Sequence, residues 1–290
     1  MKRIRVLSVL VFLFSLALFG FFRIKHSRID DSIAPRISME SETIEISVED
    51  GDEAILSGVT ASDSNDGDVS DTLIVESMGQ FLSPGRRNVT VAAFDSASNV
   101  AKETRQVIYT DYTSPVFSLS EPLRFPVNTS SILDYVTVTD VLDGDLTNQI
   151  KVSQSSYVDT SVADDYETVL TVTNSAGDTV KLPCTVTIYD TAVTSGAPVI
   201  ELSEYLIYVS PGTKINAWDY ITSVSIRGTQ YTKAEDGNLY SPDMSQSLTK
   251  SDFSIKGDVD TDTEGTYEYT YKITDSMSRT GSVRLIVAVR

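Results

Sequence analysis

Alternation of apolar and polar residues near the end of the chain predicts a β-strand with one buried face. Every second residue from 267 to 273 is a tyrosine or an isoleucine, and the residues between them are polar, which is the period of two that a strand shows. The apolar members are Tyr267, Tyr269, Tyr271 and Ile273. A polar break and a second β-rich run at residues 283–289 follow. The two runs predict a hairpin that closes an all-β module.

The same pattern occurs twice more upstream, which indicates three diverged copies of one module. In each copy a β-rich run ends in a short polar turn that begins with Asp95, Asn174 or Asp275. Modules of about 75 to 95 residues have the size of a two-sheet sandwich, which can bury its own core without disulfides. In the first copy we expect strands at 43–48, 53–56, 73–75, 88–94 and 101–109.

A strongly apolar run at residues 6–22 has no charged residue and is flanked by Lys and Arg on both sides. At about 1.5 Å per residue it spans roughly 25 Å, the lower limit for a transmembrane helix, and the basic flanks can extend to the membrane surface. A cleavable signal peptide is the alternative, because Ser15 and Ala17 have the spacing of a cleavage site. The apolar residues 18–22 that follow favour an uncleaved signal anchor.

These signals divide the chain into an anchor, two linkers and three modules. The predicted segments are a signal anchor at 1–28, a juxtamembrane linker at 29–35, module 1 at 36–112, module 2 at 113–191, a linker at 192–197 and module 3 at 198–290. The second linker is rich in small residues, so we expect a hinge there. Module 3 contains a polar insertion at 227–249, which we expect to be an exposed excursion with a hairpin around residues 235–238.

Charge is distributed unevenly along the chain. The formal net charge is -18, but the first 28 residues contain six of the 23 Lys and Arg and no acidic residue. The remainder therefore carries 17 basic and 41 acidic residues. Such a surface repels nucleic acid and attracts cations and basic partners, so we predict no nucleic-acid binding. The alternative is that the acidity serves only to keep an exported protein soluble.

Two loops of modules 1 and 2 are dense in carboxylates. Each places three Asp within six residues around a glycine, and the second loop follows the first at a constant offset of 77 positions. The candidate metal ligands are Asp63, Asp66, Asp68, Asp140, Asp143 and Asp145. Ca²⁺ takes six to eight oxygen ligands, so these loops predict weak Ca²⁺ binding. The alternative is that Asp caps local backbone N–H groups in turns without a metal. Module 3 lacks the triplet, and Ser225 aligns with Asp140.

With these motifs in view, the modules resemble the bacterial Ig-like repeats of the HYR/Big and DUF5011 type, over roughly residues 36–290. The resemblance rests on Asp63, Asp66-Gly67-Asp68, Asp140, Asp143-Gly144-Asp145, Gly265, Tyr267 and Asp275. Modules 1 and 2 match well, and module 3 matches only in its last third. The resemblance implies an immunoglobulin-like β-sandwich on an exported surface protein. With the three repeats and the apolar run, the predicted fold is all-β, with three tandem immunoglobulin-like β-sandwich modules after an N-terminal transmembrane helix. In such sandwiches Tyr166 and Tyr267 are positioned for a tyrosine-corner hydrogen bond.

Catalytic and reactive groups are scarce. The only histidine, His26, lies beside the apolar run, so the modules hold no Ser/His or Cys/His pair, and we predict no enzyme activity. The only cysteine, Cys184, excludes an intramolecular disulfide and lies in an alternating apolar run, so a buried structural thiol is expected. Trp218, Tyr231 and Tyr240 are candidates for ligand contact, with a core position as the alternative for Trp218.

The sequence therefore predicts a single-pass protein of the cell membrane, held by residues 6–22, with residues 29–290 extracytoplasmic. Its expected role is structural or adhesive, as the resemblance to surface stalks implies. Two alternatives stay open. One is a glycan- or protein-binding module that uses the third domain, and the other is an accessory subunit of an envelope enzyme complex.

Overall fold

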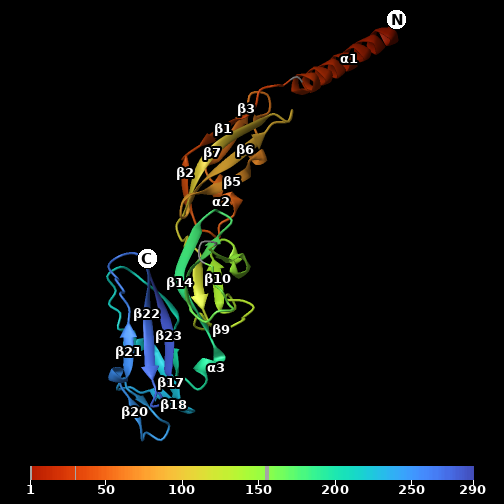
Figure 1. Cartoon of the computed structure of the whole chain (residues 1–290). Coiled ribbons are helices and arrows are strands. Elements are labelled where there is room, and N and C mark those ends of the chain that lie inside the picture. Colours follow the sequence, from red (N-terminus) through yellow and green to blue (C-terminus); the bar gives the residue numbers. More distant parts are fainter. Residues whose placement is uncertain (1, 30, 154–156) are drawn as a thin grey trace. The chain divides into compact units, whose positions relative to one another are not determined.

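The computed structural model describes residues 2–29, 31–153 and 157–290, and in its first helix it describes side chains only at residues 10–23. Helix α1 spans Lys2–Ile29 (Figure 1). Within the described residues, no helix combines the length and the apolar character needed to cross a lipid bilayer. Of the basic flanks expected at residues 1–5 and 23–28, only the exposed Arg23 lies within the residues whose side chains are described.

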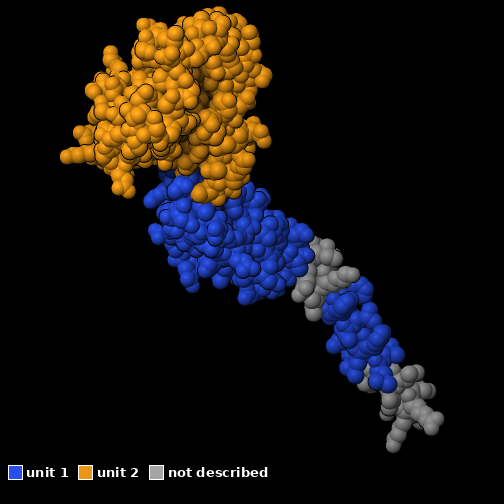
Figure 2. Space-filling view, turned by 90° about the horizontal axis from the view of Figure 1, so that it is seen from below, with its two compact units in different colours: residues 1–113, 175–178 blue, residues 114–174, 179–290 orange. Residues whose placement is uncertain are grey.

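Two compact units make up the structure, residues 1–113 with 175–178 and residues 114–174 with 179–290 (Figure 2). The chain after α1 is all-β, as predicted, and its described residues form six sheets. In module 1 one sheet has the order β1-β3-β4 and the other β2-β7-β6-β5. Their bounds are β1 (Arg36–Met39), β2 (Thr43–Ile46), β3 (Val59–Asp63), β4 (Gly67–Asp68), β5 (Ile74–Ser83), β6 (Arg86–Phe94) and β7 (Val100–Tyr109), with helices α2 (Asp52–Leu56) and η1 (Ser70–Thr72).

Module 2 repeats this plan with sheets β11-β10-β8 and β12-β13-β14-β9. Its elements are β8 (Val116–Leu119), β9 (Arg124–Pro126), β10 (Val136–Asp140), β11 (Gly144–Asp145), η2 (Thr147–Gln149), β12 (Lys151–Val152), β13 (Asp165–Thr173) and β14 (Thr179–Tyr189). The end of β3, strand β4 and helix η1 recur 77 positions later, which is the offset read from the sequence.

Module 3 has sheets β15-β17-β18-β19-β20 and β16-β23-β22-β21. Its elements are β15 (Val199–Leu202), β16 (Leu206–Val209), η3 (Ala217–Tyr220), β17 (Ile221–Ile226), β18 (Thr229–Lys233), β19 (Leu239–Tyr240), β20 (Ser247–Leu248), η4 (Lys250–Asp252), β21 (Phe253–Lys256), β22 (Gly265–Thr274) and β23 (Thr280–Val289), and α3 (Thr191–Thr194) precedes it. The insertion at 227–249 supplies β18, β19 and β20, so it extends a sheet.

One connection defines the sandwich in all three modules. The first strand pairs in one sheet, and the next strand crosses to the other sheet, where it lies parallel to the last strand: β2 to β7, β9 to β14 and β16 to β23. The remaining pairings are antiparallel, and residues of both sheets share each core, as Ile37 of β1 and Val91 of β6 do in module 1. This is an immunoglobulin-like β-sandwich.

The predicted closing hairpin is confirmed. Strands β22 and β23 pair antiparallel in continuous register from Gly265 and Val289 to Thr274 and Thr280. Tyr271 is fully buried and Ile273 is 3% exposed, while Tyr267 and Tyr269 are half-buried against the same core. Both tyrosine corners also form as predicted. The Tyr166 and Tyr267 hydroxyl groups each donate to a backbone carbonyl four residues upstream, over 3.1 Å.

One predicted strand of module 1 is wrong, because residues 53–56 form part of helix α2. Gly51 begins this helix, and Asp52 and Glu53 lie in its first turn, where negative charge interacts favourably with the helix N-terminus. Ile55 is the buried residue of the turn, at 1% exposure. A single buried side chain in so short a segment cannot distinguish a strand from a helical turn in the sequence.

Candidate functional site

The acidic loops of modules 1 and 2 share one local geometry. At the end of β3 the Asp63 carboxylate accepts hydrogen bonds from the backbone N–H groups of Asn65 at 2.7 Å and Asp66 at 3.0 Å. At the end of β10 the Asp140 carboxylate accepts the equivalent bonds at 2.9 and 3.0 Å. The bond from Asp66 and then that from Asn65 lower the pKa of Asp63 below its usual value. The first Asp of each loop therefore closes the turn.

The last Asp of each loop accepts a hydrogen bond from the first residue of the short helix that follows. Asp68 accepts from the Ser70 backbone N–H at 3.0 Å, and Asp145 accepts from that of Thr147 at 2.9 Å. Hydrogen bonds from the Ser70 and Thr147 hydroxyl groups, followed by those backbone bonds, lower the pKa of both carboxyl groups. Both Asp are exposed. The turn chemistry considered as the alternative is thus present in both loops, and Ca²⁺ binding by the loop triplets stays a prediction.

The middle Asp of the first loop faces a different turn. Asp66 accepts hydrogen bonds from the Ser96 backbone N–H at 2.8 Å and from the Ser96 hydroxyl at 3.0 Å. Asp66 and Asp68 are therefore not among the residues whose carboxylates converge with that of Asp63. Asp143 of the second loop likewise has polar interactions of its own.

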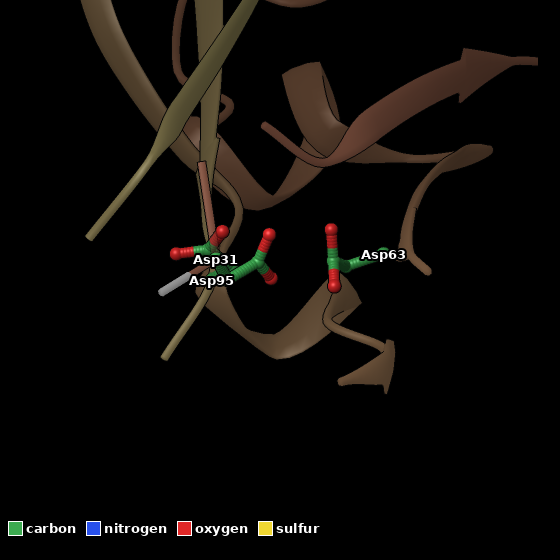
Figure 3. A group of neighbouring side chains, drawn as sticks. All are labelled: Asp31, Asp63 and Asp95. Atoms are coloured by element: carbon green, nitrogen blue, oxygen red, sulfur yellow. The ribbon is translucent and has the colours of Figure 1, made fainter. Parts of the chain in front are cut away.

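A different set of carboxylates converges at this end of module 1. Asp31, Asp63 and Asp95 each offer an oxygen, and these oxygens lie within 4.8 Å of one another. Asp31 precedes β1, Asp63 ends β3, and Asp95 follows β6, so three separate segments meet (Figure 3). Among the described residues this is the only group of three or more acidic, histidine or cysteine side chains with such spacing. Neither Asp31 nor Asp95 was among the candidate site residues predicted from the sequence. For Asp95 the available signal was the Asp or Asn that begins each hairpin turn.

The linker backbone is attached to this end of the module by Asn99. The Asn99 side-chain amide donates to the Asp31 carbonyl at 3.0 Å, to the Ile33 carbonyl at 3.4 Å and to the Asp95 carboxylate at 2.7 Å. Because one amide contacts both the linker and Asp95, the Asp31 side chain lies beside the hairpin turn. The position of Asp31 therefore depends on contacts within module 1.

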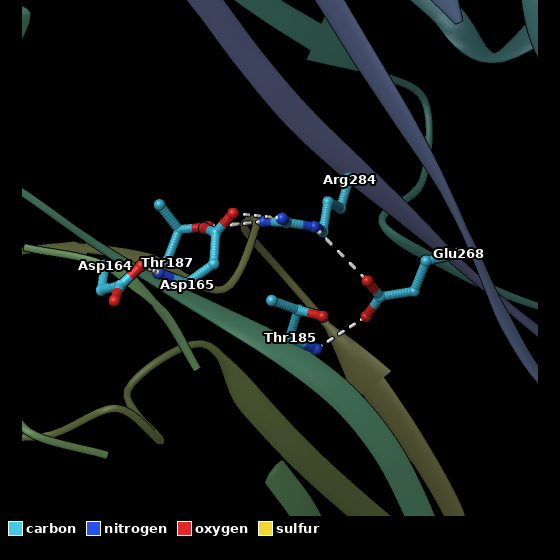
Figure 4. Close-up of polar contacts among 6 residues, drawn as sticks. All are labelled: Asp164, Asp165, Thr185, Thr187, Glu268 and Arg284. Atoms are coloured by element: carbon cyan, nitrogen blue, oxygen red, sulfur yellow. Dashed lines mark hydrogen bonds and ion pairs between the residues drawn. The ribbon is translucent and has the colours of Figure 1, made fainter. Parts of the chain in front are cut away.

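A second polar cluster joins modules 2 and 3. The Arg284 guanidinium of β23 contacts both Asp165 oxygens of β13, at 2.6 and 3.2 Å, and donates to the Thr187 hydroxyl at 2.6 Å (Figure 4). Glu268 of β22 lies 3.4 Å from the same guanidinium and accepts from the Thr185 backbone N–H at 2.7 Å. The bond from Arg284 is the main cause that lowers the pKa of Asp165.

Apolar packing accompanies this network. Leu206, Ile286 and Ala288 belong to strands of module 3, yet they are part of the buried core cluster of module 2. The other face of β23, including Leu285 and Val287, lies in the core of module 3. Helix α3, capped by the Asp190 carboxylate, includes the first residues of the linker predicted as a hinge, and the linker does not hold the two modules apart.

The insertion of module 3 is less exposed than predicted. Its hairpin turns at residues 234–238, close to the expected position, but Leu239 is fully buried and Tyr231 is 6% exposed. Trp218 is 8% exposed, packs edge-on against Phe253 at 5.2 Å and donates to the Gly237 carbonyl at 2.9 Å. Trp218 and Tyr231 are therefore core residues and not free ligand contacts. A sheet extension must bury some apolar residues against the core. The insertion has few such residues among many polar ones, so its composition predicted an exposed segment.

The single thiol is buried as expected. Cys184 is 6% exposed and lies in the core of module 2, and burial raises its pKa to about 12. A thiol with so high a pKa stays protonated near neutral pH and is a poor nucleophile.

The fold and this geometry define a protein of several immunoglobulin-like β-sandwich modules. No family model matches the chain, and no curated protein matches it. Similar solved structures include a lipoprotein of Bacteroides thetaiotaomicron, with 12% identity, a TM-score of 0.23 and coverage of 59% of this chain and 98% of that one. Another is the M60 catalytic domain with two CBM51 domains of Clostridium perfringens ZmpB, with 15% identity, a TM-score of 0.22 and coverage of 89% of this chain and 31% of that one. A third is the Protocadherin GammaB4 extracellular domain, with 14% identity, a TM-score of 0.19 and coverage of 88% of this chain and 43% of that one.

Proposed function

We propose that this protein is a membrane-anchored, extracytoplasmic spacer of the HYR/Big and DUF5011 repeat type, with a structural or adhesive role and no catalytic activity. The packing of modules 2 and 3 carries this proposal. Two sandwiches that share apolar core residues and a polar network present a stiff element, which is what a surface stalk requires. A string of modules with free linkers would not hold a terminal surface at a defined place.

The stiffness of this pair has a physical origin in β23. Its residues alternate between the core of module 3 and the core of module 2, so the strand is buried on both faces. Rotation of one module against the other would expose Ile286 and Ala288 to water, at about 25 cal/mol for each Å² of apolar surface. It would also separate Arg284 from Asp165. Both effects oppose a hinge motion.

Support for the membrane anchor comes from the exposed apolar side chains of α1. Between residues 10 and 22 of this helix the large apolar side chains are 39% to 70% exposed. They are Leu10, Val11, Phe12, Leu13, Phe14, Leu16, Leu18, Phe19, Phe21 and Phe22. Burying such residues in an apolar environment is favourable by about 1.5–3 kcal/mol each, and a lipid bilayer provides that environment. The acidic modules are repelled by an anionic membrane surface, which favours their projection away from it.

Protease treatment of intact cells tests the location. Accessible modules should be digested without cell lysis, while residues 6–22 stay with the membrane fraction. Protection of the modules until lysis would contradict an extracytoplasmic location, and recovery of the intact chain in the soluble fraction would contradict the anchor.

Spin-label distances test the stiffness. Labels at the exposed Lys181 of module 2 and Lys256 of module 3, in a Cys184→Ser background and in the full chain in detergent, should give one narrow distance distribution. Arg284→Ala should broaden it. A broad distribution in the chain with Arg284 intact would overturn the spacer role.

A binding role for module 3 is the second candidate, and it is favoured by the tip of the insertion. Met244 is 66% exposed in the turn between β19 and β20, in a stretch that modules 1 and 2 lack. Tyr240 lies on the same hairpin, with its hydroxyl 2.7 Å from Asp236. Deletion of residues 227–249 would remove core side chains, so Met244→Ser is the better test. Binding to glycans or cell-wall fragments is measured on an array. Binding by Met244→Ser at the level of the unsubstituted chain would argue against this site, and so would absence of binding by the unsubstituted chain.

A further inference from the structure

We propose that Asp31, Asp63 and Asp95 together bind one divalent cation, Ca²⁺, where the linker enters module 1. Ca²⁺ binds carboxylate oxygens at about 2.3–2.6 Å, so one ion can contact oxygens that lie up to about 5 Å apart. The three oxygens meet this condition, since they lie within 4.8 Å of one another. Figure 3 shows the Asp63 carboxyl group extending from the strand end toward Asp31 and Asp95.

Unsatisfied oxygens point to a missing ligand. Asp63 is 8% exposed, and its Oδ2 is buried without a hydrogen-bond partner among the described residues. Its Oδ1, in contrast, accepts two backbone bonds. The Oδ2 of Asp31 is buried and unpartnered in the same way, while its Oδ1 accepts from the Ile33 backbone N–H at 3.0 Å. Buried carboxylate oxygens are normally paired with a donor or a cation.

No basic side chain neutralises the group within the part of the chain that the structure describes. The ion pairs found there involve Lys102, Arg279 and Arg284, and none includes these three carboxylates. Three negative charges at this separation repel one another, and partial burial weakens the screening by solvent. A bound cation removes the repulsion and satisfies both unpartnered oxygens.

In modules 2 and 3 the residue that begins the hairpin turn takes part in hydrogen bonds that involve protein groups alone. In module 2 the residue equivalent to Asp95 is Asn174, and its amide donates to Asp140 Oδ2 at 3.2 Å. In module 3 the equivalent Asp275 receives two hydrogen bonds from the Arg279 guanidinium, at 2.8 and 2.6 Å. Among the described residues, module 1 alone has a carboxylate in both positions: the Asn99 amide donates to Asp95, but Asp63 Oδ2 receives no donor.

Module 3 also has no acidic side chain where β17 ends. The sequence aligned Ser225 with Asp140, but β17 carries a bulge against β15. As a result Ser225 takes the place of Thr139, and Ile226 takes the place of Asp140. Neither residue offers a carboxylate, so Asp275 has no acidic partner to balance.

The linker carboxylate differs between modules as well. Asp31 lies four residues before Pro35, and Asp111 lies four residues before Pro115 at the next boundary. Asp111 accepts from the Ser47 hydroxyl at 2.6 Å and from the Val48 backbone N–H at 2.9 Å, so both of its oxygens are satisfied within module 1. The convergence of a linker carboxylate with two loop carboxylates is therefore particular to the start of module 1.

The cation would cross-link the segment before β1 to two loops of the sandwich. Asn99 already holds the linker backbone beside the hairpin turn, and the metal adds a bond through the Asp31 side chain. The direction in which the chain enters module 1 would then depend on Ca²⁺. This inference is independent of the proposed function.

Calorimetric titration of the full chain in detergent with CaCl₂ tests the site, with MgCl₂ as the competing ion. We expect saturable Ca²⁺ binding at this site that Asp31→Asn weakens at least tenfold. Asp31 lies outside the strands, so this variant should fold. Asp63→Asn should have the same effect if it folds. Asp68→Asn and Asp140→Asn are the matched controls, since each removes one carboxylate from an acidic loop without touching the cluster, and they should keep this binding.

Three results would overturn the inference. The first is no saturable Ca²⁺ binding at several millimolar. The second is equal binding by the chain with and without Asp31→Asn. The third is loss of binding in Asp68→Asn but not in Asp31→Asn, which would assign the ion to the loop triplet of the sequence prediction.

Discussion

The ends of β3 and β10 have the same backbone but different chemistry. Asp63 and Asp140 each close a turn with two backbone hydrogen bonds of similar length. Asp140 then receives an amide bond from Asn174, whereas Asp63 faces Asp95. One residue in the opposite hairpin turn thus decides whether the pair is satisfied by the protein or needs a cation. A repeated fold conserves the position of a side chain while leaving its partner free to change.

The largest effect is expected when the module 1 pair is built into module 2. Asn174→Asp would place two carboxylates together in a site where Asp140 is 7% exposed, without an added cation. Loss of the amide donor and burial of like charges should destabilise the second unit by about 2–3 kcal/mol, measured by urea unfolding in EDTA. Asn148→Asp adds a negative charge at an exposed position of the same module and is the control. It should change the free energy of unfolding little. Equal stability of both variants would contradict the comparison.

The reverse exchange should remove the dependence on Ca²⁺. Asp95→Asn gives module 1 the residue of module 2, so an amide can donate to Asp63 in place of the ion. At ten times the dissociation constant Ca²⁺ should stabilise the original chain by about 1.4 kcal/mol, and the variant should lose most of this. Scanning calorimetry with EDTA and with CaCl₂ measures the difference. An unchanged Ca²⁺ response would show that Asp95 is not a ligand.

The smallest effect concerns module 3 and depends on pH. The Arg279 guanidinium is the main cause that lowers the pKa of Asp275 below 3.8. A carboxyl group with a lowered pKa stabilises the fold above its unfolded pKa, and this contribution is lost as pH falls through the lower, folded pKa. Arg279→Met should therefore be less stable than the parent at pH 6, and the two stabilities should converge as the pH falls through the lowered pKa of Asp275. A constant gap across this range would mean that the pair does not act through its charge.

Local features of the fold were predictable because they depend on residues close in sequence. The period of two in β22, the tyrosine corners at Tyr166 and Tyr267, and the 77-residue offset of the acidic loops all follow from spacing along the chain. Helix α2 was missed because a five-residue segment with one buried side chain, Ile55, has no distinct period.

Contacts between distant segments were not predictable in the same way. The sequence grouped Asp63 with Asp66 and Asp68 because they are neighbours, but the turn directs those two toward Ser96 and Ser70. Asp31 and Asp95 each lie 32 positions from Asp63, and only the packing of the sheet that contains β1 and β3 against the sheet that contains β6 brings such segments to the same end. Arg284 and Asp165 are 119 positions apart, and no pattern along the chain connects them.

The two buried faces of β23 also bear on how the protein is made. Every other strand of modules 2 and 3 precedes β23 in the chain, and β23 supplies Ile286 and Ala288 to the core of module 2. During synthesis and export, the apolar face of module 2 that packs against β23 therefore stays exposed until a segment about 100 residues downstream has been made. Over that interval the incomplete pair of modules exposes apolar surface that chaperones and proteases can bind. A premature stop within β23 would leave two modules defective, not one.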